Sequence, residues 1–265
     1  AGSTPAARRE RQPARVAGAG AGGSLRPGGR RVGEGAWATL VAPTAADALV
    51  AIGTEAVGEA VRARAAPAGS SAAGDARPTV VPGVDDEGAP GSAVLPAVEG
   101  LLAAETRRVE HPVLSVVGAS GTARAALDVA VVTDEPAQIA RYGVERPSGR
   151  HVSVRADGVV VATPLGSRGY AAAVGGPQTD ADTGLAVVPV APFSTQKPVW
   201  VVDGGVHVGL ERGDGAVALV VDGERRSAVE PGETVAVTVT DHVTVAVPTR
   251  PGDAAHADRQ GSNNP

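Results

Sequence analysis

Side chains that could bind a phosphate or an aromatic ring gather in one short stretch, VVVATPLGSRGYAAAVGGP, at residues 159–177. A β-branched run ends at Pro164, and small residues follow it around Arg168 and Tyr170. Side chains this small let a backbone come close to a neighbouring element or to a ligand. We predict one helix at Ser167–Val174, and a turn that enters a helix presents free N–H groups to an anion.

Tyr170 supplies a ring in a chain that has only two tyrosines and one phenylalanine. Its side chain could stack on the ring of a ligand. The structural interpretation is that Tyr170 fills the core and that the nearby glycines permit close packing. The residues alone favour neither interpretation.

Other motifs that could bind nucleotides or metals have simpler structural interpretations. GAGAGG at Gly18–Gly23 matches the spacing of a dinucleotide fingerprint but lacks the strand before it and the helix after it, so we interpret it as low-complexity chain. GASGT at Gly118–Thr122 lies between two β runs, which favours a hairpin loop over a phosphate cradle. Lys197 is the only lysine and no Walker A motif surrounds it, and the five histidines lack the paired spacing of a metal site.

The composition bounds the core and the chemistry. A chain of 265 residues can bury one large core or two smaller ones, and we expect two units. The absence of cysteine excludes disulfides, thiolate zinc sites and a thiol nucleophile. The core must be built from Val, Ala and Leu, which bury less area per residue than aromatic side chains do, so the stability of a monomer should be modest.

The charge pattern bears on partners and location. The net charge is −5 and no basic stripe is visible, which argues against nucleic acid as the main partner. No stretch reaches the roughly 18 uninterrupted apolar residues of a membrane span. The first residues, AGSTPAARRERQPAR, lack the apolar region of a secretory signal. We therefore expect a cytoplasmic protein without a membrane partner.

The pattern of secondary-structure signals in the sequence changes near Val109. Residues 1–30 and 249–265 have almost no apolar periodicity, which predicts a flexible arm and a disordered tail. Strand and helix signals alternate between residues 31 and 108, which predicts a small α/β domain with a parallel sheet. In chain order these signals are a strand at Ala48–Gly53, a helix at Glu55–Ala65, a strand at Pro78–Val84 and a helix at Ala93–Glu105.

Residues 109–248 are a succession of short Val-rich runs separated by turns, which predicts an all-β sandwich. The predicted strands are Pro112–Val117, Ala125–Thr133, Ile139–Glu145, Val152–Arg155, Gly158–Thr163, Leu185–Val190, Val199–Val202, Val206–Glu211, Ala216–Val221, Thr234–Thr240 and His242–Val247. Asp-Gly pairs supply hairpin turn chemistry at Asp157-Gly158, Asp203-Gly204, Asp214-Gly215 and Asp222-Gly223. The predicted fold class is α+β in two domains.

The stretch RADGVVVATPLGSRGYAAAVGGP, residues 155–177, closely resembles the NAD kinase family, whose second domain carries a segment of the form DG-[apolar]-TPTGSTAYxxSxGGP. The resemblance runs in order from about Val109 to Pro248 and includes VEHPVLSV, ERPSGRHVSVRADG, LAVVPVAPFSTQKPVWV and LVVDGERR. It implies the architecture of that family, with a reduced α/β domain followed by a β-sandwich that holds a dinucleotide.

The resemblance also implies binding residues. In that family the small residues let the dinucleotide lie against the backbone, while the tyrosine and the acidic residue of the DG pair contact it. The positions of this chain that match are Asp157, Gly166, Ser167, Gly169 and Tyr170.

The sequence departs from the family pattern at positions that bear on catalysis. The family carries GGDGT, whose aspartate activates the attacking ribose hydroxyl or holds magnesium, and this chain reads LVAIGTEAVGEA there. Gly53-Thr54 can be matched to this motif, which puts Ile52 at the aspartate position, and a register shifted by two residues puts Thr54 there instead. The resemblance implies Gly53 and Thr54 as binding positions. The adjacent carboxylate is Glu55, and we predict that it takes the catalytic role.

Further departures lie in the second domain. Asp128-Val129 stands where the family has an Asn-Glu pair, so we predict Asp128 as a binding residue. Arg168 replaces a threonine, Ala173 a serine and Phe193 a histidine. An arginine could contact a phosphate bidentately where the family uses a hydroxyl, which would suit NADP or the triphosphate donor at least as well as NAD.

The resemblance implies phosphorylation of NAD at the 2′-hydroxyl of its adenosine ribose, with ATP or polyphosphate as donor and magnesium as cofactor. The departures leave open a non-catalytic NAD(P)-binding or regulatory protein, and the placement of Glu55 distinguishes the two. A lipid-kinase-like relative is a weaker interpretation because the sequence shows no hydrophobic pocket. Few aromatic residues, a short first domain and the family's packing through the β domain lead us to expect a homodimer or homotetramer.

Overall fold

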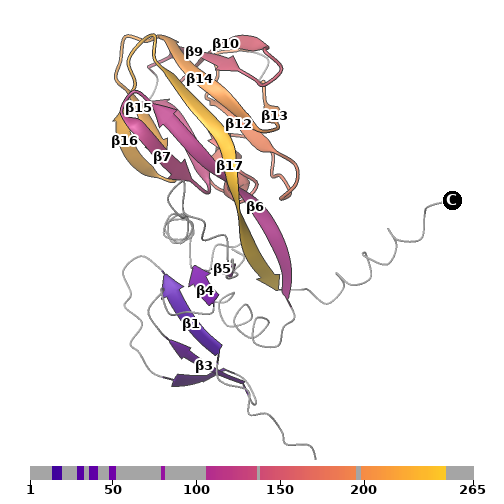
Figure 1. Ribbon diagram of the computed structural model, residues 1–265. Coiled ribbons are helices and arrows are strands. Elements are labelled where there is room, and N and C mark those ends of the chain that lie inside the picture. Colours follow the sequence, from indigo (N-terminus) through magenta and orange to yellow (C-terminus); the bar gives the residue numbers. More distant parts are fainter. Residues whose placement is uncertain are drawn as a thin grey trace, which may run out of the picture.

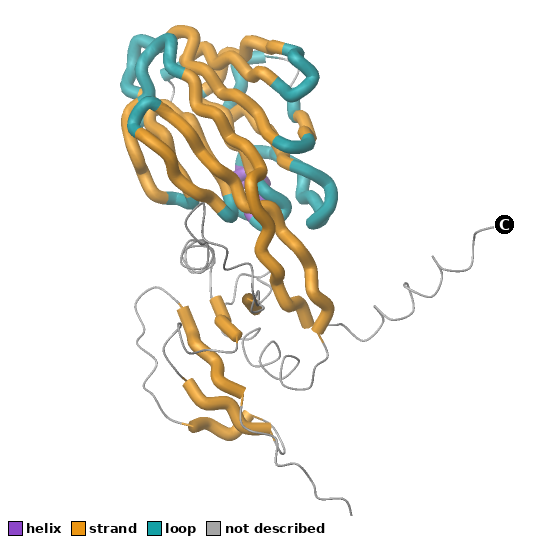
Figure 2. The backbone as a smooth tube through the Cα atoms, in the orientation of Figure 1, coloured by secondary structure: helices purple, strands orange, loops and turns teal. Residues whose placement is uncertain are grey.

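The computed structural model describes residues 106–135, 138–194 and 198–248, and strands at residues 14–19, 29–32, 36–40, 48–51 and 79–80. Figure 1 shows a β-sandwich connected by two long strands to a smaller group of strands. Figure 2 shows that helix occupies only a small part of the described chain. None of the helices in the described part is long and apolar enough to cross a membrane.

The smaller sheet of the sandwich has six strands in the order β13-β12-β11-β8-β15-β16, and every neighbouring pair is antiparallel. Its strand β11 has the sequence GVVVA, and all of its residues are buried, as expected for a strand that is covered on both faces. The strand bounds are β8 Asp128–Thr133, β11 Gly158–Ala162, β12 Leu185–Val190, β13 Trp200–Val202, β15 Val217–Val221 and β16 Glu224–Ala228.

The larger sheet supplies the other layer of the sandwich through the order β10-β9-β14-β17, with β6 paired to β17 and β7 paired to β6. β6 and β17 pair antiparallel along most of their length and extend beyond the sandwich (Figure 1). These strands are β6 Thr106–Gly118, β7 Gly121–Ala125, β9 Ala140–Glu145, β10 His151–Ala156, β14 Gly205–Arg212 and β17 Thr234–Pro248.

The same sheet continues into the first part of the chain, because β17 pairs in parallel with β5. β4 pairs in parallel with β5 and β1, and β1 with β3, while β2 and β3 are antiparallel. These parallel pairs confirm the predicted parallel sheet. The bounds are β1 Ala14–Ala19, β2 Gly29–Val32, β3 Ala36–Leu40, β4 Ala48–Ala51 and β5 Thr79–Val80.

One strand lies inside the segment that was predicted to be a flexible arm. The predicted arm, residues 1–30, contains strand β1 (Ala14–Ala19), which is paired on both sides. Its sequence ARVAGA has a single β-branched residue, Val16, and is otherwise mostly small residues, so it resembles low-complexity chain. The helical patterns at residues 55–65 and 93–105 and the predicted tail lie outside the described residues.

The all-β sandwich is confirmed, and the strand boundaries differ in informative ways. The predicted run Ala125–Thr133 breaks into β7 and β8, and the two last predicted strands are the single strand β17, with a register shift between Val239 and Asp241. β16 was not predicted because its sequence, ERRSA, is polar and exposed. The GASGT segment is the β6–β7 hairpin, with Gly118 opposite Gly121, as predicted.

The main core lies between the two sheets and is built from valine, leucine and alanine side chains around the buried Tyr142. A second, smaller cluster lies on the other face of the smaller sheet, where α3 (Tyr170–Ala173) packs. Its buried members are Ala130, Val160, Ala162, Ala171, Ala186 and Val188. Alanines at this contact let the short helix lie close to the sheet.

The predicted helix Ser167–Val174 is divided. A 3-10 turn, η2 (Gly166–Arg168), comes first, and the four-residue helix α3 follows after Gly169. A helix this short offers no N-terminal anion site, so any phosphate contact in this region depends on side chains.

Candidate functional site

The candidate site lies on the outer face of the smaller sheet, where a turn and a loop pack together. The turn follows β11 and begins at Thr163, and the loop joins β7 to β8. The amide of Thr163 donates to the Leu127 carbonyl at 2.8 Å, and its hydroxyl donates to the Ala126 carbonyl at 2.6 Å. Because both groups of one threonine hold the loop, turn and loop form a single unit.

The buried carboxylate of Asp222 fixes this loop from the other side. It accepts the backbone amides of Ala126 at 3.0 Å, Leu127 at 2.8 Å and Asp128 at 3.2 Å. Asp222 is only 6% exposed and has a φ of 49°, a left-handed conformation that Asp and Asn tolerate better than most residues. The β15–β16 hairpin therefore positions the first residue of β8.

Two predicted binding positions, Gly166 and Ser167, are buried against the protein itself. A Cβ on Gly166 would collide with the backbone of Leu127, so only glycine fits. The Ser167 hydroxyl donates to the Pro164 carbonyl at 2.8 Å and accepts the amide of Thr179 at 3.1 Å. Both residues shape the turn, and their contact with a ligand remains a prediction.

Arg168 and Tyr170 are the exposed side chains of the turn. Tyr170 is 43% exposed, while the next residue, Ala171, is completely buried and anchors α3 on the sheet. Arg168 is exposed, and Gly169 between the two is half-buried. This exposure argues against the interpretation that Tyr170 fills the core, and it leaves the ring accessible to a ligand.

The ring of Tyr170 lies in the field of two carboxylates. Partial burial raises the pKa of the Tyr170 hydroxyl, and the negative charges of Asp128 and Asp157 raise it further. Asp128 is opposite Ala162 at the end of β11, and Asp157 directly precedes the start of that strand. The two carboxylates thus flank opposite ends of β11, and the charge of each acts on the Tyr170 hydroxyl.

Asp128 has a strongly perturbed carboxyl group. Burial, with the negative charge of Asp222 as the second cause, raises the pKa of Asp128 to about 6. Its carboxyl group therefore changes charge close to neutral pH, and it can accept a hydrogen bond when ionised and donate one when protonated.

We expect Asp128→Asn to raise the free energy of unfolding by about 1–2 kcal/mol above pH 6 and to change it little below about pH 4. Between these values the native state of the wild type holds a proton that the unfolded chain has lost, so its stability falls as pH rises through this window. The amide carries no such charge. Denaturant unfolding of both proteins at about pH 4, 5 and 7 measures the difference, and a pH-independent difference would contradict it.

The other predicted residues, Gly53, Thr54 and Glu55, lie outside the described residues. Within the described part, no three histidine or carboxylate side chains are grouped so that they could hold a metal ion.

Sequence reasoning missed Asp222 and Thr163 as residues of the site. Asp222 was interpreted only as part of a hairpin turn, and its segment LVVDGERR carried the family resemblance without a role. The pattern contains no signal that the carboxylate points inward to three amides, because its partners lie more than ninety residues earlier in the chain.

The part of the chain that matches known sequences includes most of the residues of this site. Residues 128–249 match the family described as the ATP-NAD kinase C-terminal domain. The chain is 35% identical over 111 residues to the NAD kinase of Methanosarcina acetivorans, a match that spans 41% of this chain and 40% of that protein. It is also 35% identical over 122 residues to the NAD kinase of Methanoculleus marisnigri, spanning 45% of each. The matches thus cover less than half the length of these relatives.

Two solved structures share the fold over a larger part of the chain. A yeast NADH kinase complexed with NADH superposes with a TM-score of 0.61 at 15% identity, covering 86% of this chain and 71% of that one. An NAD kinase from Archaeoglobus fulgidus in complex with ATP superposes with a TM-score of 0.57 at 20% identity, covering 84% of this chain and 88% of that one. At such identities the likeness establishes the fold.

Proposed function

The chain belongs to the NAD kinase family through its residues 128–249, and from this premise we propose that it binds NAD and phosphorylates it at the 2′-hydroxyl of the adenosine ribose. The observation that carries the proposal is the half-exposed ring of Tyr170, which stands on the turn that resembles the family's ligand turn and is influenced by the charges of Asp128 and Asp157. The proposed donor is ATP or polyphosphate with magnesium.

The chemistry of Tyr170, Asp128 and Asp157 suits a dinucleotide. The exposed ring of Tyr170 can stack on a base, and the carboxylates of Asp128 and Asp157 can accept hydrogen bonds from ribose hydroxyls. Arg168 stands two residues before Tyr170 and is exposed. Its guanidinium can contact a phosphate of the dinucleotide or of the donor bidentately.

The transfer forms one bond and breaks one. The ribose 2′-oxygen bonds to the terminal phosphorus of the donor while the bond from that phosphorus to its bridging oxygen breaks, which leaves ADP or a polyphosphate shorter by one unit. The hydroxyl proton passes to the carboxylate of Glu55. Magnesium, when bound with the donor, would neutralise charge on the donor phosphates.

A non-catalytic NAD(P)-binding protein is the second candidate, because Ile52 occupies the position of the family's GGDGT aspartate. One assay separates the candidates. The purified chain is incubated with NAD, magnesium and either ATP or polyphosphate, and NADP is measured, with a reaction lacking donor as control. Formation of NADP supports the kinase, NAD binding without NADP supports the binding protein, and absence of both would overturn the two proposals.

We expect Tyr170→Ala to weaken the affinity for NAD or NADP about tenfold, through the loss of roughly 1–2 kcal/mol of stacking and apolar burial. The stability of the ligand-free protein should change little, because the ring is 43% exposed. Calorimetric titration and thermal melting on the same sample measure both quantities.

The other tyrosine is the matched control for this variant. Tyr142 is completely buried, so Tyr142→Ala should leave a cavity and lower the stability by about 3–5 kcal/mol. If Tyr170→Ala behaved like this control, with a large fall in melting temperature and unchanged affinity, the ring would be structural and the turn would not be a binding turn.

A further inference from the structure

Three arginines form a row across the outer face of the larger sheet, on the opposite side of the sandwich from Tyr170. Arg155 on β10 pairs with Arg141 on β9, and Arg141 pairs with Arg212 on β14 after a register shift in β14. All three side chains are exposed, whereas the adjacent Tyr142 points into the core between the sheets. We call these three residues the arginine row.

The spacing within the arginine row is short. The amide of Arg146 donates to the Arg150 carbonyl at 3.0 Å, and because hydrogen-bonded and non-hydrogen-bonded pairs alternate along a ladder, Arg141 and Arg155 form a non-hydrogen-bonded pair. The Cα atoms of such a pair are about 4.5 Å apart and the side chains are at their closest. Like charges directly opposite each other destabilise a sheet, so folding alone does not favour this arrangement.

Other described arginines of the sandwich form ion pairs with carboxylates. Arg124 binds Asp241 at 2.9 Å, and Arg225 binds Asp134 at 2.8 Å. No ion pair involves the arginine row among the residues for which the structure describes side chains. Within the described part of the chain, no carboxylate therefore forms a direct ion pair with the arginine row.

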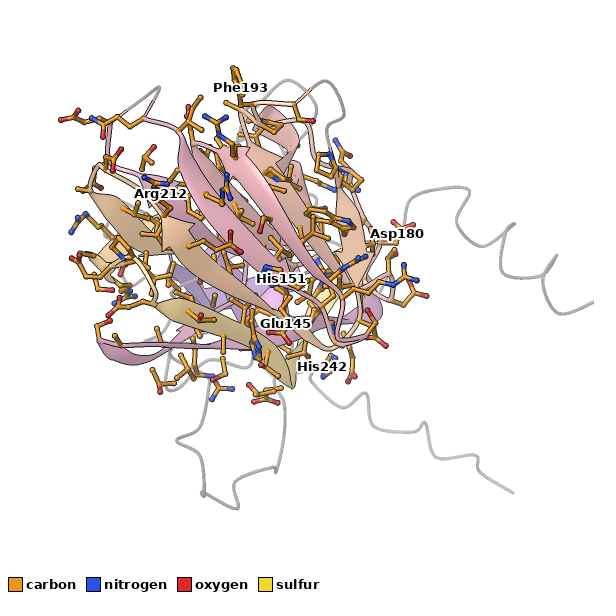
Figure 3. All side chains as sticks on the ribbon, turned by 90° about the horizontal axis from the view of Figure 1, so that it is seen from above. Glu145, His151, Asp180, Phe193, Arg212 and His242 are labelled. Atoms are coloured by element: carbon orange, nitrogen blue, oxygen red, sulfur yellow. The ribbon has the colours of Figure 1, made fainter. Side chains whose placement is uncertain are left out.

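The neighbouring carboxylate, Glu211, is influenced by the charge of Arg141, which contributes to lowering its pKa, but its hydrogen bonds go to other residues. It accepts the hydroxyl of Ser153 at 2.8 Å and lies 2.8 Å from Nε2 of His151. The guanidinium of Arg155 lies 5.1 Å from the centre of the Phe193 ring, which holds one end of the row in place. Figure 3 labels Phe193, Arg212 and His151, and it shows Phe193 and Arg212 separated from His151, the histidine near Glu211.

We propose that the arginine row binds an anion that carries a chain of phosphoryl groups. The row crosses two interstrand spacings, about 10 Å, which exceeds the size of one phosphate and suits a chain of two or three. Guanidinium groups bind phosphate oxygens through planar, charge-assisted pairs of hydrogen bonds. The chain of phosphates can belong to a free oligophosphate or to a nucleotide, and this site is independent of the one around Tyr170.

The test is a calorimetric titration of the full chain with sodium tripolyphosphate at low ionic strength, where exposed charges are least screened. Arg141→Gln should bind tripolyphosphate at least tenfold more weakly than the wild type. Arg226→Gln is the matched control, because Arg226 is an exposed arginine that pairs with Glu224 at 2.7 Å on the other sheet, and it should bind like the wild type. Tyr170→Ala should also bind tripolyphosphate like the wild type.

Thermal melting without ligand gives a second readout. Arg141→Gln should melt at the same temperature as the wild type or higher, because it removes one of the repelling charges. A parallel titration with ATP identifies the source of the phosphates: an equal loss of affinity in Arg141→Gln indicates a nucleotide, and a loss confined to tripolyphosphate indicates a free oligophosphate. No binding of tripolyphosphate, or an affinity that Arg141→Gln does not change, would overturn the proposal.

Discussion

Asp222→Asn should lower the free energy of unfolding by about 2–4 kcal/mol, because hydrogen bonds to a buried charge are the strong ones and three backbone amides share this carboxylate. Asparagine keeps the size of the side chain and tolerates the left-handed backbone at φ 49°, so the substitution isolates the charge. The amide oxygen of asparagine accepts hydrogen bonds more weakly than a carboxylate oxygen does. The NH₂ group of asparagine would face the backbone N–H donors of the loop.

The control for Asp222→Asn is Asp203→Asn, which changes another aspartate of an Asp-Gly pair. Asp203 is exposed, and its substitution should change the stability by less than about 0.5 kcal/mol. Denaturant unfolding of both variants gives the two values. Equal stability of the two variants would show that the loop holds its conformation without the charge of Asp222.

Asp222→Asn has a second consequence at Asp128. The negative charge of Asp222 is one of the two causes that raise the pKa of Asp128, so its removal should lower that pKa toward the ordinary value. The pH window in which the wild type loses stability should then narrow. A structural defect confined to the hairpin would not move this window.

The sequence pattern was sufficient for the sandwich because the strands there bury one or both faces. Leu185–Val190 was predicted with its observed bounds, since an uninterrupted apolar run between turns has few alternatives. The polar edge strand β16 gave no such signal, because its side chains are exposed and only its backbone is paired to β15. The six residues of β1 were missed for the opposite reason, since small residues carry too little periodicity.

The candidate site was predictable as a segment, but the role of each residue was not. GSRGY was singled out from its small residues, and the fold divides it into buried positions that shape the turn, Gly166 and Ser167, and exposed ones, Arg168 and Tyr170. Which side chain points outward depends on contacts with Leu127 and Thr179. Those contacts join residues that are distant in the sequence, so local pattern could not assign them.

The arginine row could not be predicted from local sequence either. Arg141, Arg155 and Arg212 are spaced irregularly along the chain, and nothing in their local sequence connects them. They become neighbours only through the register of three antiparallel strands and the shift before Arg212. A one-residue change in that register would send each side chain to the opposite face.

Glu55→Gln should reduce NADP formation at least about a hundredfold if the chain is a kinase, because losing a general base or a metal carboxylate typically costs that much or more. The variant keeps the size of the side chain and removes its charge. Ile52 leaves the usual aspartate position without a carboxylate, so Glu55 is the adjacent residue that could accept the proton of the ribose hydroxyl.

Glu59→Gln is the matched control for Glu55→Gln, since it removes the same charge four residues further along the predicted helix. It should retain turnover close to that of the wild type. Affinity for NAD should be similar in both variants, because the proposed dinucleotide contacts come from Asp128, Asp157 and Tyr170, so the loss should appear in kcat and leave KM nearly constant. Unchanged turnover in Glu55→Gln would exclude Glu55 as base or metal ligand. Equal losses in both variants would indicate a general effect of charge near the donor.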